Sequence, residues 1–178
     1  MYYTGAGDNG TSTIFNSKER LSKSSTIFEL LGTLDELNSW LGLCVVEAAD
    51  FPEIKDILRD TQHSLFTVQA YFAQANIDFS VSILNRIEEE IKNLSLKIKE
   101  RKSFILSGGC RLSALLDITR SIARRVERCA VRLSDKQPQK INPTVLAYLN
   151  RLSSLFYVLA RLANDLSEVD EESPVYYK

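Results

Sequence analysis

The chain has 178 residues, of which 44% are hydrophobic and 25% are charged. This composition is typical of a folded protein, and the length suits one domain with a sizeable core. Lys and Arg number 22 against 23 Asp and Glu, for a net charge of -1, which leaves no overall basic field for nucleic acid or a membrane surface. No apolar run approaches the roughly 18 residues of a membrane span, and no signal-peptide pattern begins the sequence. We therefore expect a cytoplasmic protein.

The cysteines and the single histidine exclude common metal and disulfide frameworks. Cys44, Cys110 and Cys129 are odd in number, widely spaced and set among apolar residues, as expected for reduced, buried thiols. His63 is the only histidine, and the sequence contains no Cys-x-x-Cys motif. We expect no zinc site and no metal held by protein ligands alone.

Apolar residues at three- and four-residue steps predict five helices. The first spans about 27–49, and the second opens at Pro52, which suits a first helical turn. The third carries a seam of apolar residues over 84–98, and the fourth runs from near Gly109 to about Ser134. A loop is predicted at 136–140. The fifth helix starts at Asn142-Pro143, with Asn as the cap and Pro in the first turn.

The predicted fold class is all-α: a five-helix bundle with an irregular N-terminal arm. The arm covers 1–26, the bundle 27–169 and a C-terminal tail 170–178, and together they form a single domain over 1–178. A short piece at 13–15 is the only sign of a strand.

The arm contains the first candidate site, a run rich in glycine and hydroxyl side chains from Thr4 to Thr13. Glycines let backbone N–H groups turn inward and hydroxyls add donors, as a phosphate cradle requires. Arg20 and Lys23 follow closely and could fold back onto the same anion. The run lacks the Gly-Lys-Ser/Thr ending of a Walker A loop, and a frayed terminal loop is the alternative.

The predicted fourth helix carries the second candidate site. Arg120, Arg124 and Arg128 stand four residues apart, so their guanidiniums share one stripe. Like charges at this spacing repel each other by a few tenths of a kcal/mol per pair. A bound polyanion or a carboxylate of a partner subunit would explain the stripe, because guanidinium forks bind both bidentately. A solvated basic face is the alternative.

Polar residues also interrupt otherwise apolar helices. Asn38 and Asn150 fit ordinary positions at the boundary of the core. Asp35 lies between Leu34 and Leu37, and a part-buried carboxylate there would require a paired cation.

Five short motifs in register carry a family resemblance that covers almost the whole chain. They are Gly7-Asp8-x-Gly10-Thr11-Ser12, Gly32-Thr33-x-Asp35-Glu36-Leu37-Asn38-Ser39, Phe104-Ile105-Leu106-x-Gly108-Gly109, Arg120-x-x-x-Arg124-Arg125-x-Glu127-Arg128 and Asn150-Arg151-Leu152-Ser153. Together they resemble the PduO-type ATP:cob(I)alamin adenosyltransferases. The resemblance implies a single adenosyltransferase-like domain that assembles as a homotrimer, with ATP bound between adjacent subunits.

The resemblance also implies roles for residues of the arm and of the arginine stripe. Those that would bind the triphosphate and its Mg²⁺ are Thr4, Gly7, Asp8, Gly10, Ser12, Thr13 and Lys23. Those that would complete the nucleotide site from the neighbouring subunit are Arg124, Arg125, Glu127, Arg128 and Asn150.

Three residues match the catalytic positions of the family. Asp35 and Arg120 match an intersubunit salt bridge at the active site. Phe104 matches an aromatic residue that packs below the corrin ring and displaces its lower axial base, which makes cob(II)alamin easier to reduce. The resulting Co(I) attacks the ribose 5′ carbon of ATP and expels triphosphate. The implied partners are a cobalamin reductase and an adenosylcobalamin-dependent enzyme. A core position for Phe104 is the alternative.

Several residues depart from the family pattern. Gly5-Ala6 stands for the usual Lys-Thr, Ser24 and Ser154 each for an Asp, Ser107 for Pro and Asp117 for His. These changes leave open a diverged member that binds ATP or corrinoid as a carrier or sensor without catalysis. A helical protein-interaction or nucleic-acid module is a third possibility. The net charge and the absence of aromatics on the arginine stripe disfavour nucleic acid.

Overall fold

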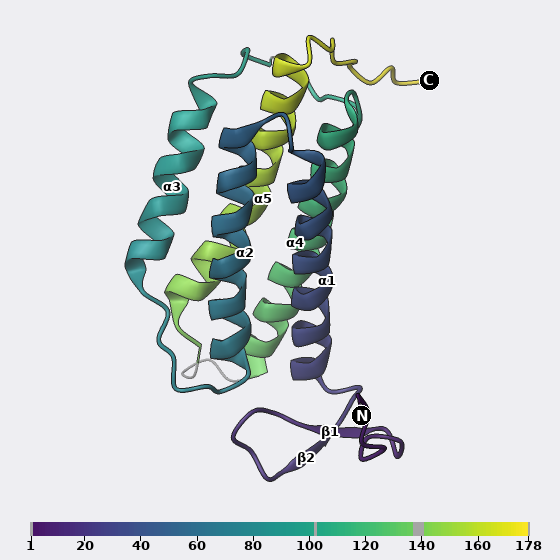
Figure 1. Cartoon of the computed structure of the whole chain (residues 1–178), viewed down its shortest axis with the longest axis vertical. Helices are drawn as coiled ribbons and strands as arrows, with labels where there is room; N and C mark the ends of the chain where they lie inside the picture. The colour runs from purple at the N-terminus through teal and green to yellow at the C-terminus, as the bar shows by residue number, and fades with distance from the viewer. Residues whose placement is uncertain (1, 102, 137–140, 178) are drawn as a thin grey trace.

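In the part of the chain that the structure describes, five helices form a bundle. They lie alongside one another, with the N-terminal arm at one end (Figure 1). The computed structural model describes residues 2–101, 103–136 and 141–177. The helices are α1 (Thr26–Glu47), α2 (Pro52–Phe72), α3 (Val81–Ser95), α4 (Arg111–Lys136) and α5 (Pro143–Leu166). The predicted all-α five-helix bundle is therefore confirmed. Most of the loop predicted at 136–140 lies outside the described residues.

Local sequence explains where the helices begin and end. The side chain of Asn142 accepts a hydrogen bond from Thr144 N at 2.9 Å, and Pro143 occupies the first turn of α5, as predicted. The apolar seam was predicted to continue to Ile98, but α3 ends earlier, at Ser95. There Lys97 N donates to Leu94 O at 2.9 Å, which is a tighter turn than that of an α-helix.

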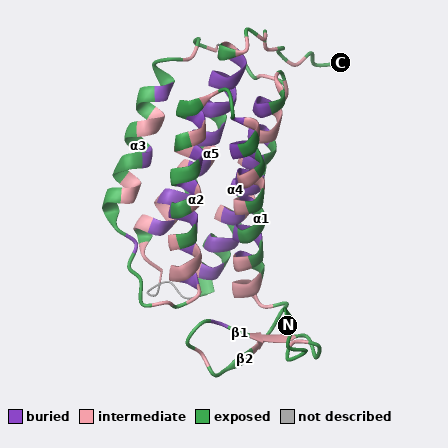
Figure 2. Cartoon of the chain, in the orientation of Figure 1, coloured by how far each residue is buried: buried purple, intermediate pink, exposed green. Residues whose placement is uncertain are grey.

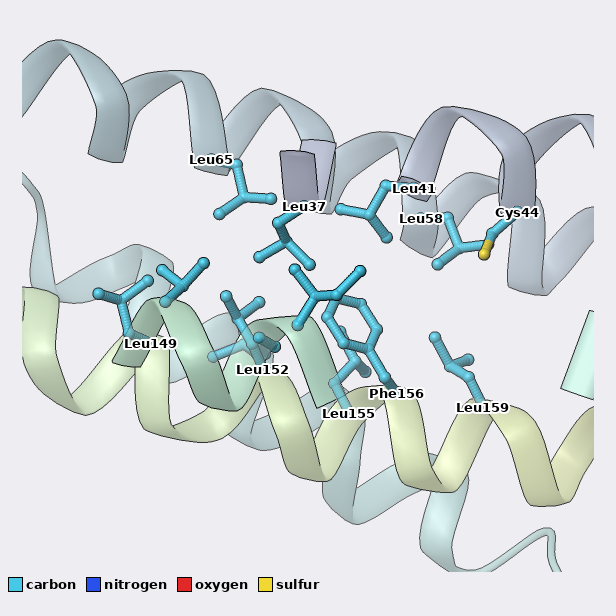
Figure 3. Packing of buried hydrophobic residues seen from close by; sticks show 14 of the residues in the cluster. Leu37, Leu41, Cys44, Leu58, Leu65, Leu149, Leu152, Leu155, Phe156 and Leu159 are labelled. Carbon is cyan, nitrogen blue, oxygen red and sulfur yellow. The ribbon is translucent and has the colours of Figure 1, made fainter. Parts of the chain in front are cut away.

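The core lies between the facing apolar seams of the helices. α5 packs against both α3 and α4, and α1 packs against both α2 and α4. Leu37, Leu41, Leu58, Leu152 and Phe156 are fully buried and meet at the centre (Figure 3). Buried faces turn inward along each helix while exposed faces turn outward (Figure 2). Within the described ranges, no helix has the length and hydropathy of a membrane span.

The arm differs from the prediction because it forms a small hairpin. β1 (Thr11–Thr13) pairs antiparallel with β2 (Arg20–Ser22), with Ser12 opposite Leu21. The strand predicted at 13–15 thus begins two residues earlier, and its partner was missed because three residues show no alternation. Ile14 is the only buried residue in 2–25, and the hairpin stands beyond the first turn of α1 (Figure 1).

Candidate functional site

The arm folds its two cations back onto its own glycine-rich turn. Lys23 Nζ donates to Gly7 O at 2.9 Å, and Arg20 Nε donates to Thr11 Oγ1 at 2.8 Å. A Cβ at Gly7 would come within 2.9 Å of Lys23 Nζ, so a larger residue there would make the end of the lysine side chain shift. The predicted triphosphate residues all belong to this one segment: Thr4, Gly7, Asp8, Gly10, Ser12, Thr13 and Lys23. The turn therefore gathers backbone amides, hydroxyls and cations, which is the composition of an anion site.

Arg20 also reaches the position where the sequence departs from the family pattern. Its NH2 donates to Ala6 O at 2.5 Å, beside the Gly5-Ala6 pair. The Arg20 guanidinium from β2 therefore contacts the segment in which the sequence lacks the usual lysine.

A polar hollow on α4 and α5 collects most of the predicted arginine-stripe residues. We call it the arginine hollow; its volume is about 520 Å³, within the usual range for small-molecule sites. Its lining residues are Arg124, Glu127, Arg128, Val131, Arg132, Asp135 and Asn150. Asn150 Nδ2 donates to Glu127 Oε1 at 2.7 Å, so this carboxylate is held by α5. Three guanidiniums against two carboxylates leave the hollow positive.

Two arginines of α4 lie differently from what the motif suggested. Arg132 was not predicted, yet it lines the arginine hollow one turn beyond Arg128. The four-residue spacing of Arg124 and Arg128 predicts Arg132 on the same helix face. Arg125 was predicted at the nucleotide, but its guanidinium forms an ion pair with Glu36 of α1 and does not line the hollow.

Asp35 and Arg120 do not meet within one chain. Asp35 is exposed on α1, so it is not a part-buried acid in the single chain. Arg120 is 29% exposed, and its Nε lies 3.3 Å from Asp117 Oδ1. A pair between subunits stays a prediction, and Arg120 already has a counter-charge on its own helix.

Phe104 belongs to the connection from α3 to α4. That connection lies at the end of the bundle opposite the hairpin (Figure 1). Phe104 is 80% exposed. The alternative that Phe104 is a core residue is therefore wrong. An exposed aromatic ring on a loop is available to pack against the face of a planar ligand.

Sequence reasoning missed a buried arginine close to this loop. Arg161 of α5 is 1% exposed, and its NH2 lies 2.9 Å from Asp117 Oδ2. Its Nε lies 2.8 Å from Glu171 Oε1, an ion-pair distance without the alignment of a hydrogen bond. One signal was present in the sequence, because Arg161 interrupts the apolar run that begins at Leu155.

Comparison with known proteins decides the family. Residues 2–163 match the model of the family described as "Cobalamin adenosyltransferase". The chain belongs to the cobalamin adenosyltransferase family. A corrinoid adenosyltransferase of Bacillus subtilis is 35% identical over 176 residues, covering 95% of this chain and 89% of the relative. The corrinoid adenosyltransferase PduO of Salmonella typhimurium is 34% identical, covering 89% of this chain and 48% of the longer relative.

A solved structure extends the likeness to the whole adenosyltransferase fold. It is a variant of a PduO-type ATP:corrinoid adenosyltransferase from Lactobacillus reuteri, complexed with cobalamin and ATP. The two chains superpose with a TM-score of 0.90 and share 31% sequence identity. The match covers 98% of this cobalamin adenosyltransferase family member and 99% of the other chain.

Proposed function

We propose that this chain transfers the 5′-deoxyadenosyl group of ATP to cob(I)alamin and releases triphosphate. The family match and the near full-length relatives support this reaction. The observation that carries the proposal is the arginine hollow, where Arg124, Arg128 and Arg132 converge beside Asn150. Guanidinium groups in such a hollow suit a polyphosphate, because each offers charge-assisted, bidentate contacts.

In this reaction the protein has to position the two substrates and stabilise the developing charge. The Co(I) centre of the substrate is itself the nucleophile, so no side chain has to form a covalent intermediate. Negative charge grows on the triphosphate as the bond to the ribose 5′ carbon breaks. The excess positive charge of the arginine hollow stabilises that leaving group, and binding of both substrates aligns the reacting atoms.

Magnesium fits the arm as an ion that ATP itself brings. Among the described residues, no three His, Cys, Asp or Glu side chains lie close enough to hold a metal ion. The arm offers the Asp8 carboxylate and the hydroxyls of Thr4 and Ser12. This donor set suits Mg²⁺ bound mainly by phosphate oxygens and water, with few protein ligands. The bound ion would neutralise charge on the triphosphate.

The complete site would require a second copy of the chain. The lining of the arginine hollow comes from α4 and α5, whereas the predicted phosphate cradle lies on the arm. The hairpin projects beyond the bundle, where a neighbouring subunit can reach it (Figure 1). In the proposed homotrimer, the arm of one subunit closes over the hollow of the next, and Asp35 pairs with Arg120 across that interface.

The proposal also assigns a role to Phe104 and a cellular setting to the reaction. The exposed ring would pack below the corrin and exclude its lower axial base. Because Co(I) demands a strong reductant, the reaction belongs in the cytoplasm beside a cobalamin reductase. An adenosylcobalamin-dependent enzyme would consume the product.

Anaerobic incubation with reduced cobalamin, ATP and Mg²⁺ tests the proposal. The visible spectrum should change to that of a cobalt–carbon bond, in amounts that match the triphosphate released. No change should occur without ATP. Binding of ATP or cobalamin without that spectral change would refute catalysis and identify a carrier or sensor.

A further inference from the structure

Six side chains of alternating charge run without a break across the end of the bundle that carries Phe104. We call them the six-charge chain. In order they are Asp165, Arg101, Glu171, Arg161, Asp117 and Arg120. The charges of three guanidiniums and three carboxylates cancel. Each of the four residues between Asp165 and Arg120 contacts two groups of opposite charge.

The inner part of the chain is buried. The side chains of Arg161, Glu171 and Asp117 are 1%, 4% and 5% exposed. A buried charge is tolerated only when it is paired, so each of these groups depends on its neighbours. Asp117 is shared: Oδ2 contacts Arg161 and Oδ1 contacts Arg120.

The outer members of the six-charge chain, Arg101 and Asp165, connect the segment just before residues 103–110 to the end of α5 and the C-terminal tail. Arg101 NH2 lies 2.7 Å from Asp165 Oδ1, and Arg101 Nε lies 2.5 Å from Glu171 Oε2. Asp165 Oδ2 also accepts a hydrogen bond from Lys99 N at 2.9 Å. Burial acts to raise the pKa of Asp165, but the Lys99 hydrogen bond and Arg101 outweigh it and hold the pKa below its ordinary value.

Backbone contacts attach the Phe104 loop (residues 103–110) to the same structure. Leu106 N donates to Glu172 O at 2.8 Å, next to Glu171 in the tail. Gly108 N lies 3.4 Å from Asp117 Oδ2. A Cβ at Gly109 would come within 2.3 Å of Asn164 Oδ1, so the loop lies directly on α5. The tail and the six-charge chain therefore each contact the backbone of this loop.

We propose that Glu171 and Asp117 are positioning residues for the corrin substrate, an inference that rests on the proposed function. The exposed ring of Phe104 has little packing to fix it, so its position follows the backbone of the loop. The six-charge chain links that backbone to Arg120, which is proposed to lie at the subunit interface. It thus sets the distance between the corrin end and the nucleotide end of the site.

Glu171→Gln tests this link, with Glu172→Gln as the matched control. The first change removes the carboxylate between Arg101 and Arg161, whereas the second alters an exposed side chain and keeps the backbone contact of Glu172. For Glu171→Gln we expect amide hydrogen exchange in 103–110 to rise about tenfold or more, as for the loss of one charge-assisted contact. The KM for cobalamin should rise several-fold while the KM for ATP stays within about twofold.

Arg101→Lys covers the case in which Glu171→Gln fails to fold, because Arg101 lies outside the helices. Lysine keeps the charge but not the planar fork that contacts two carboxylates. It should produce the same faster exchange and the same selective change for cobalamin.

Exchange in 103–110 that matches the Glu172→Gln control would overturn the proposal. Equal changes in the two KM values would also overturn it, because a general structural role predicts them. If the wild-type chain makes no cobalt–carbon product, the proposed function fails. Hydrogen exchange then still decides whether the six-charge chain holds the loop.

Discussion

Replacing Phe104 with alanine separates a role in corrin binding from a role in stability. Phe104 is 80% exposed, which leaves about one fifth of the residue buried. Since full burial of such a side chain contributes about 1.5–3 kcal/mol, the truncation should cost only about 0.3–0.6 kcal/mol. In a chain of 178 residues, this corresponds to a Tm lower by about 1–2 °C. Phe156→Ala, at a fully buried position, should cost about 3–5 kcal/mol.

The assay combines thermal melting, ATP titration and the spectrum of cob(II)alamin bound with ATP. Phe104→Ala should melt close to wild type and bind ATP with nearly unchanged affinity. It should lose the four-coordinate spectral signature and slow adenosylation when reduction is limiting. A melting loss as large as that of Phe156→Ala, together with lost ATP binding, would refute the reasoning. An unchanged four-coordinate signature would refute it as well.

Three further changes probe the interface, the arginine hollow and the ion pairs. Asp35→Asn should lower activity strongly and the Tm only slightly, since Arg120 keeps a counter-charge on its own helix. A fully active monomer in sedimentation would contradict the interfacial site. Arg128→Ala should raise the KM for ATP and lower kcat by removing a contact of about 1.5–3 kcal/mol, whereas Arg59→Ala, exposed on α2, should change neither. Because the pKa of Asp165 is lowered on folding, the stability lost in Asp165→Asn should be largest at neutral pH and fall as the pH drops through that pKa. Urea unfolding of both proteins at a series of pH values from neutral into the acid range measures this loss. A difference that stays constant over the whole series would contradict the ion-pair assignment.

The bundle was predictable because its signals are local. Apolar seams recur every three or four residues, and Asn142-Pro143 is a start signal that lies within a few residues of sequence. The hairpin was not predictable, since Thr11–Thr13 and Arg20–Ser22 are too short to show alternation. Their pairing depends on the turn between them and on the contacts of Arg20 with the arm.

The candidate site was predictable only within single segments of the chain, such as the arm or one helix. Spacing along α4 placed Arg124 and Arg128 on one face, and the same rule extended by one turn gives Arg132. Contacts between distant parts of the chain left no such pattern. Glu171 reaches Arg161 from the tail, and nothing in the sequence near either residue specifies that meeting.

Under the proposed function, the hairpin arm would open the nucleotide site without affecting the stability of the bundle. Its segment 2–25 buries one residue, Ile14, so detaching it exposes little apolar surface and requires only a small free energy of local opening. The five helices can therefore stay folded while the arm opens and closes. If the arm closes over ATP as proposed, ATP loading and triphosphate release would involve movement of this segment alone. Proteases that cut after lysine or arginine should first cleave at Lys18, Arg20 or Lys23 and leave the helices intact. Protection of these three sites by ATP would then report directly on arm closure.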